Sequence, residues 1–206
     1  MEQPKNNFKI VSDKKARMIL PNAITLVGVC IGLTSIKFAL DGKFALAVVA
    51  ILFSGLMDAL DGRIARLIKG TSKIGKELDS LGDVISFGVA PAFIMYFWNL
   101  QYLEKLGWFV CLIYVVCVAL RLARFNVSSN EEPTWKDDFF EGVPSPAGGI
   151  IVLMPLVLSF SGLGDLFFKI NYDVIVPLFF IIVSILLIST IPTYSFKRIV
   201  IPRSMT

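Results

Sequence analysis

Six long apolar segments dominate the sequence, and they constrain the fold more than any other feature. They cover residues 18–40, 44–68, 77–98, 106–125, 144–164 and 171–191. A helix of about 20 apolar residues spans the roughly 30 Å hydrocarbon core of a bilayer, and each segment is close to that length. Hydrophobic residues make up 55% of the chain, above the roughly 45–50% of soluble domains. The sequence therefore predicts an all-α integral membrane protein, a bundle of six transmembrane helices.

The polar ends of the chain flank this bundle. Residues 18–196 are predicted to form one membrane domain, with a cytoplasmic segment at 1–17 and a cytoplasmic tail at 197–206. The stretch from Phe8 to Ile19 is basic and fits a helix lying on an anionic membrane surface, with a disordered tail as the alternative. Its charged part is too long for a signal peptide.

The lysines and arginines predict the orientation of the bundle. Six spans put both termini on one side, and only four of the 20 lysines and arginines then fall on the other side: Lys37, Lys43, Lys105 and Lys169. Loops on the cytoplasmic side of a membrane carry an excess of basic residues. Both termini are therefore expected to be cytoplasmic.

Composition excludes several kinds of chemistry. The chain contains no histidine, which rules out Ser-His-Asp hydrolysis, H-E-x-x-H zinc sites and histidine phosphotransfer. Cys30, Cys111 and Cys117 lie in apolar segments without C-x-x-C spacing, so they are expected to pack in helices rather than to form disulfides or bind zinc. A net charge of +4 is too small to indicate nucleic-acid binding.

Four aspartates stand on two predicted helix faces, one on each side of a short connection around residues 70–72. The first face comprises Asp58, Asp61 and Ala65, and the second comprises Gly75, Asp79, Asp83 and Ser86. Residues three or four apart share a helix face, and the short connection makes the two helices antiparallel neighbours. The small residues Gly62, Ala65 and Gly75 leave room for a ligand or for close approach of the helices.

The depth of this cluster follows from helix geometry. Asp58 stands fifteen residues after Lys43, which is about 22 Å of helix at about 1.5 Å per residue. In a core about 30 Å thick, Asp58 lies slightly inside the cytoplasmic boundary. A lipid headgroup and a soluble molecule can both reach that level.

The residue types at this site favour a hard divalent cation. Four carboxylates repel one another unless cations neutralise them, and an oxygen-rich cluster selects Mg²⁺ or Mn²⁺, here one ion or two. Such ions keep positions open for phosphate oxygens, and Arg66 could add a forked donor. The arrangement predicts phosphoryl-type transfer at the cytoplasmic face. Structural ion pairs between helix ends are the alternative.

The spacing of these residues also carries a family resemblance. The pattern Asp58-x-x-Asp61-Gly62-x-x-Ala65-Arg66-(eight residues)-Gly75-x-x-x-Asp79-x-x-x-Asp83 resembles the signature of the CDP-alcohol phosphotransferases. The resemblance implies six membrane helices, a homodimer, a binuclear metal site and a CDP-linked lipid donor from which CMP leaves. It implies that the metal ligands are Asp58, Asp61, Asp79 and Asp83, with Asp83 also the general base and therefore the catalytic residue. It implies a CDP pocket lined by Gly62, Ala65, Arg66 and Gly75.

Further stretches resemble the bacterial members of the family that use serine as the acceptor. They are Ser86–Pro91, Leu120–Asn126 and Gly142–Pro146, together with Pro21-Asn22-x-x-Thr25. The resemblance implies transfer of a phosphatidyl group from CDP-diacylglycerol to L-serine at the bacterial inner membrane. Candidate serine-binding residues are Ser86, Arg121, Arg124, Asn126 and Ser145. Candidate CDP-lipid-binding residues are Asn22, Thr25 and Asp58, in addition to the four pocket residues.

Plainer explanations exist for some of these residues. Arg121 and Arg124 would stand at the cytoplasmic end of a helix for topology alone. Pro21-Asn22 also reads as an ordinary helix start.

Two rival functions follow from the same residues. One keeps the chemistry but changes the acceptor to glycerol 3-phosphate, inositol or inositol phosphate. A phosphorylated acceptor would need more clustered cations than two arginines provide, which favours serine. The other rival is a cation or proton transporter that uses the four acids as a relay. Transporters often show inverted repeats and sites at mid-membrane, and neither feature is evident here.

Overall fold

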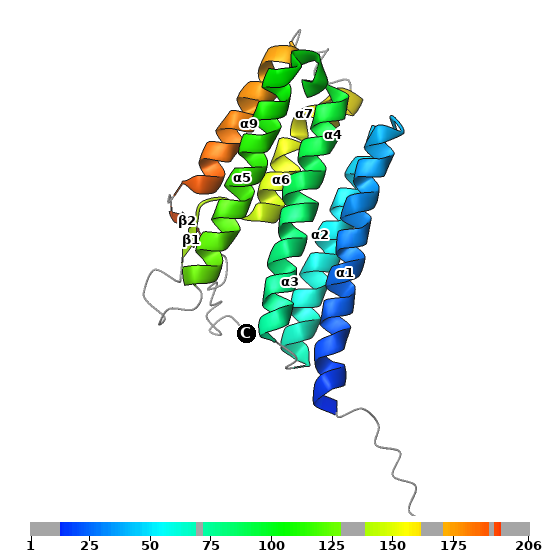
Figure 1. Cartoon of the computed structure of the whole chain (residues 1–206), viewed down its shortest axis with the longest axis vertical. Helices are drawn as coiled ribbons and strands as arrows, with labels where there is room; N and C mark the ends of the chain where they lie inside the picture. Colours follow the sequence, from blue (N-terminus) through cyan, green and yellow to red (C-terminus); the bar gives the residue numbers. More distant parts are fainter. Residues whose placement is uncertain (1–12, 69–71, 129–138, 162–170, 190–191, 195–206) are drawn as a thin grey trace, which may run out of the picture.

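The computed structural model describes residues 13–68, 72–128, 139–161, 171–189 and 192–194, and in these the chain is almost entirely helical (Figure 1). Four helical segments are long and apolar enough to cross a membrane: Ile19–Leu40, Phe44–Leu67, Ile74–Trp98 and Lys105–Val127. They match the first four predicted segments. The protein is therefore an integral membrane protein of the α class.

The first half of the chain forms three long helical rods, each antiparallel to the next. α1 (Asp13–Leu40) and α2 (Phe44–Leu67) are single helices. The third rod joins α3 (Lys73–Asp83), the π-helix η1 (Val84–Val89) and α4 (Ala90–Trp98). Residues 13–17 continue the helix of the first span, and residues 1–12 lie outside the described residues, so the expected N-terminal surface helix stays a prediction.

The second half is less regular than the sequence predicted. A 3₁₀ turn, η2 (Leu100–Leu103), leads into α5 (Lys105–Ser128). The predicted fifth span is split into α6 (Ser145–Val152) and α7 (Met154–Ser161), and the sixth corresponds to α9 (Tyr172–Ile188). At 17 residues, α9 is shorter than a full span, so a count of six spans also remains a prediction.

A small sheet joins the segment before α6 to the segment after α9. β1 (Phe139–Glu141) pairs antiparallel with β2 (Pro192–Tyr194). Directly after β1, Gly142 has φ +72°, and a Cβ there would lie 2.7 Å from the carbonyl oxygen of Ser189. Glycine tolerates both the positive φ and the close approach. This turn sets the start of α6 against the end of α9.

The π-helical segment η1 has a local cause in the sequence. Pro91 stands four residues after Phe87 and has no N–H, so it cannot donate the α-helical bond to the Phe87 carbonyl. The hydroxyl of Tyr114 donates to that carbonyl instead, at 2.7 Å, and Tyr114 is completely buried. π-bulges are rare and often lie at functional sites. Here the bulge begins immediately after Asp83.

The helices pack in two groups that meet at η1. α1 packs along α2 and also against α3, η1 and α4, whereas α5 packs along α9. η1 contacts α1, α2, α5 and α6, so it lies at the centre of the bundle. The buried core contains Phe87, Tyr114 and Phe180. This core supports the helix turn that carries Asp83.

Candidate active site

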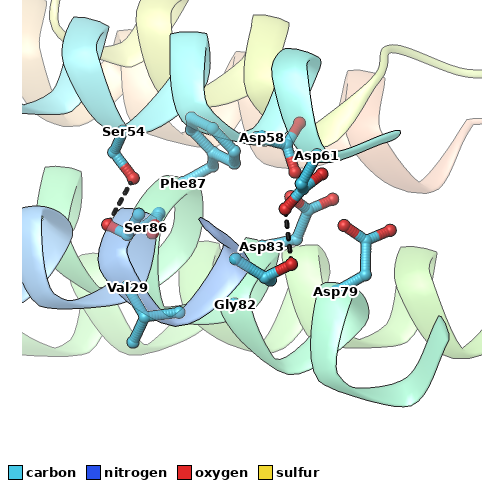
Figure 2. A pocket seen from close by; sticks show the side chains of 11 residues that line it. Val29, Ser54, Asp58, Asp61, Asp79, Gly82, Asp83, Ser86 and Phe87 are labelled. Carbon is cyan, nitrogen blue, oxygen red and sulfur yellow. Dashed lines mark hydrogen bonds between the residues drawn. The ribbon is translucent and has the colours of Figure 1, made fainter. Parts of the chain in front are cut away.

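The four predicted aspartates come together at one pocket (Figure 2). Asp58 and Asp61 extend from α2, and Asp79 and Asp83 extend from α3. One carboxylate oxygen from each of Asp58, Asp61 and Asp79 lies within 4.8 Å of the others. Asp58 also interacts with the carboxyl group of Asp83. The helix faces expected from spacing are therefore correct.

α2 and α3 were expected to be neighbours that face each other, and the carboxylates of Asp58 and Asp61 on α2 lie within 4.8 Å of that of Asp79 on α3. The backbones of α2 and α3 stay farther apart than those of α1 and α2, while α1 packs against both helices. α2 approaches the rod that continues α3 more closely farther along, through η1 and α4. The space between the facing side chains of α2 and α3 is lined on one side by Thr25 of α1.

A small cavity lies within the aspartate cluster. Its volume is about 10 Å³, enough for one water-sized sphere. The polar residues that line it are Thr25, Ser54, Asp58, Asp61, Asp79, Asp83 and Ser86. Asp61 is only 4% exposed. The Oδ1 atom of Asp83 is buried and has no hydrogen-bond partner among the described residues.

These residues fit a divalent cation. The donors are carboxylate and hydroxyl oxygens without histidine or cysteine, the set that Mg²⁺ and Mn²⁺ prefer. In the described residues no lysine or arginine forms a salt bridge to the four aspartates. Buried carboxylates need a compensating charge. The unpartnered Asp83 oxygen and the close carboxylate group are both what a metal centre requires.

A much larger cavity opens beside the cluster. Its volume is about 500 Å³, within the range of small-molecule pockets. Six of the predicted CDP-lipid-binding residues line it: Asn22, Thr25, Gly62, Ala65, Arg66 and Gly75. The seventh, Asp58, lines the small cavity instead. Because Thr25, Asp61 and Asp79 line both cavities, the two spaces adjoin at the carboxylates.

Two glycines shape the large cavity in different ways: Gly62 leaves space open, and Gly75 allows two helices to pack closely. A Cβ at Gly62 would meet no atom within 4 Å, so this position faces open space. A Cβ at Gly75 would lie 2.8 Å from Oδ1 of Asn22. Gly75 therefore lets α3 approach α1 at the rim of the cavity.

Ser72 and Lys76 also line the large cavity, although neither was predicted from the sequence as a binding residue. The Ser72 side chain accepts a hydrogen bond from the backbone N–H of Gly75, so it caps α3. Lys76 stands three residues before Asp79 and thus on the same helix face. This three-residue spacing from Asp79 could have identified Lys76 from the sequence alone. Lys76 adds a second cationic side chain to the cavity beside Arg66.

Three of the predicted serine-binding residues lie near Asp83. Nη1 of Arg121 donates a 2.6 Å hydrogen bond to Oγ of Ser145, which joins α5 to the start of α6. Arg121 interacts electrostatically with Asp83, and its Nε is buried without a hydrogen-bond partner in the described part of the chain. Ser86 lines the small cavity. Nε of Arg121, a donor, and Oδ1 of Asp83, an acceptor, thus both lack a hydrogen-bond partner among the described residues.

The other two predicted serine-binding residues make contacts between helices. Nη1 of Arg124 donates to the Ile188 carbonyl at the end of α9, at 2.9 Å. Nδ2 of Asn126 donates to Oγ of Ser80 on α3, at 2.9 Å. The structure thus groups Arg121, rather than Arg124, with the aspartates.

Comparison with known proteins gives a consistent family. Residues 18–191 match the CDP-alcohol phosphatidyltransferase family. A Mycobacterium leprae protein named CDP-diacylglycerol–serine O-phosphatidyltransferase is 43% identical over 143 residues, covering 68% of this chain and 47% of the relative. Proteins of that name from Helicobacter pylori (35% over 181 residues; 88% of this chain, 74% of the relative) and Bacillus subtilis (34% over 142 residues; 69% and 76%) also match. The chain spans about half the length of its mycobacterial relatives.

Proposed function

The chain belongs to the CDP-alcohol phosphatidyltransferase family, and we propose that it transfers the phosphatidyl group of CDP-diacylglycerol to the hydroxyl of L-serine. The products are phosphatidylserine and CMP. One observation carries the proposal: the aspartate cluster adjoins a large cavity, and the half-buried Arg121 lies close enough to Asp83 to interact with it electrostatically. A lipid-linked nucleotide and a small zwitterion could meet across those aspartates.

The large cavity is proposed to hold the CDP moiety. Arg66 and Lys76 provide cationic groups for the diphosphate, while Gly62 and Ala65 leave space for the nucleotide. Asn22 stands against Gly75 and could donate or accept at the cytosine edge. The diacylglycerol tails would enter sideways from the lipid of the inner leaflet.

Asp58, Asp61, Asp79 and Asp83 are proposed to hold Mg²⁺ or Mn²⁺, as a pair of ions. When bound, the metal neutralises the diphosphate and stabilises charge on the transferred phosphate and on CMP. The residues around it must orient the two substrates and exclude competing water.

Serine is proposed to enter from the cytoplasm between Asp83 and Arg121. The Arg121 guanidinium would bind the serine carboxylate, with Ser145 holding that guanidinium through its hydrogen bond and Ser86 close to the acceptor. Asp83 accepts the proton of the serine hydroxyl. The serine oxygen then attacks the phosphorus nearest the lipid, and the bond from that phosphorus to the bridging oxygen breaks to release CMP.

The proposal extends to location. We place residues 18–196 in the bacterial inner membrane as one domain, with residues 1–17 and 197–206 in the cytoplasm and the active site at the cytoplasmic face. A homodimer is proposed from the family resemblance. The excess of basic residues toward the end of the bundle that holds the site supports this orientation.

Release of CMP tests the reaction directly. Purified protein with CDP-diacylglycerol, L-serine and Mg²⁺ or Mn²⁺ should release CMP and form phosphatidylserine. EDTA should abolish the reaction, and excess divalent metal should restore it. The same assay with glycerol 3-phosphate, inositol or inositol phosphate in place of serine should release far less CMP.

Two results would contradict the proposal. Faster CMP release with another acceptor would keep the chemistry but remove serine as the substrate. Metal-independent ion flux through proteoliposomes without CMP release would favour the transporter.

A further inference from the structure

Thr25 makes a contact that the proposed reaction does not by itself require. Its hydroxyl donates to Oδ2 of Asp61 in a short hydrogen bond, from α1 to α2. The same hydroxyl lies 3.1 Å from the carbonyl oxygen of Pro21, one turn earlier in α1. The family resemblance made Thr25 a candidate CDP-lipid-binding residue. The hydroxyl instead faces a carboxylate that is 4% exposed.

The proton of this hydroxyl is directed to Asp61. A threonine hydroxyl has one proton to donate, and both Asp61 and the Pro21 carbonyl are acceptors. Hydrogen bonds to an ionised carboxylate are shorter and stronger than those to a neutral carbonyl. Donation to Asp61 therefore prevails whenever Asp61 is ionised, which is its state as a metal ligand.

The methyl group of Thr25 faces a third helix. A Cβ placed on Gly82 of α3 would lie 3.6 Å from the Thr25 methyl carbon, so the methyl group points toward α3 while the hydroxyl points toward α2. A β-branched side chain has few χ1 rotamers, and the hydrogen bond to Asp61 fixes the one seen here.

We propose that Thr25 is a positioning residue for the metal centre: it orients the Asp61 carboxylate as a ligand and does not contact the nucleotide through its hydroxyl. This rests on the proposed function only in assigning a divalent metal to the aspartates. Outer partners of metal ligands fix ligand orientation, and their loss typically costs about 10–100-fold in metal affinity. Thr25 holds that position for Asp61.

Metal binding without substrate tests this role. Mn²⁺ binding to the full chain in detergent is measured by electron paramagnetic resonance of the free ion. Thr25→Val should weaken Mn²⁺ binding about 10–100-fold, and Thr25→Ser, which keeps the hydroxyl, should restore it. Thr25→Ala should weaken binding as Thr25→Val does, because it removes the hydroxyl without placing a methyl group against Asp61.

Thr34 offers a matched control in the same helix. Its hydroxyl donates to the Cys30 carbonyl at 2.6 Å, the same one-turn bond that Thr25 makes to Pro21, but on an exposed face. Thr34→Val should therefore leave Mn²⁺ affinity unchanged. Native affinity in both Thr25→Val and Thr25→Ala would overturn the inference, as would an equal loss in Thr34→Val.

The outcomes separate this inference from the proposed function. A native chain that binds Mn²⁺ with the expected pattern of variants, but releases no CMP with serine, would refute the acceptor and retain the role of Thr25. A native chain that transfers to serine while all Thr25 variants bind Mn²⁺ normally would retain the function and refute the role of Thr25.

Discussion

Asp83 and Arg121 are the two charged residues of the site with buried polar atoms that lack a hydrogen-bond partner in the described residues. Leaving a buried polar group unpaired costs about 1–3 kcal/mol, and more when the group is charged. A cost of this size at two interacting side chains is expected where a substrate or ion completes the bonding. The unpaired atoms of Asp83 and Arg121 fit the proposed binding of the acceptor between these two residues.

Replacing Asp83 separates binding from catalysis. Asp83→Asn keeps the shape of the side chain but removes its ability to accept the serine proton. CMP release should fall at least about 10²–10⁴-fold, the usual contribution of a general base, whereas CDP-diacylglycerol binding should persist. The measurements are kcat for CMP release at saturating metal and CDP-lipid binding by equilibrium dialysis. Near-native kcat in this variant would refute the assigned role.

Of the residues at the site, the aspartates were the easiest to predict from the sequence, and the arginines were the hardest. Asp58 and Asp61 belong to one helix face through spacing alone, which depends only on helix geometry. Choosing Arg121 over Arg124 required knowing that Ser145 lies beside one and the end of α9 beside the other. Those partners are distant in sequence, so no local pattern distinguishes the two arginines.

At the scale of elements, η1 connects the site to the core. Its Phe87 packs closely against glycines from two other helices. A Cβ at Gly149 of α6 would lie 3.0 Å from the Phe87 carbonyl oxygen, and one at Gly55 of α2 would lie 3.4 Å from the Phe87 ring. Small residues let membrane helices approach closely. The turn after Asp83 is thereby held on both sides.

This packing predicts a stability defect at Gly149. Gly149→Ala should destabilise the protein by about 1–3 kcal/mol through overpacking, because the added methyl meets the backbone of η1. Thermal unfolding in detergent measures the effect. Gly62→Ala is the matched control, since its added methyl meets no atom within 4 Å and both changes carry the same gain in helix propensity. Equal unfolding temperatures for the two variants would contradict the close packing at η1.

At the scale of the whole molecule, large apolar side chains cover the outside of the bundle. Leu26, Leu33, Leu46, Phe53 and Leu120 are each about half exposed. In water such a surface would be an aggregation hazard, whereas in a bilayer it contacts lipid tails. The site lies toward the end of the bundle where α1 begins and α2 ends, opposite the turn between α4 and α5 (Figure 1).

The proposed orientation predicts which end of the bundle is accessible from outside the cell. Gln101 is exposed in η2 and Arg63 is exposed near the end of α2. In intact cells, a membrane-impermeant maleimide should label Gln101→Cys but not Arg63→Cys, which should react only after permeabilisation. The native chain gives the background from Cys30, Cys111 and Cys117. The reverse pattern would place the active site on the outer face.

The sequence by itself determined the membrane class, the first four helices and the four aspartates. Apolar length and helical spacing are local properties, and a bilayer forces each spanning segment to satisfy its own backbone hydrogen bonds. Only the tertiary structure decided that α1 packs against both α2 and α3, that α6 and α7 are two short helices, and that Thr25 meets Asp61. Each of these depends on which distant segments pack together, and that choice is made by side-chain fit across the bundle rather than by any one segment.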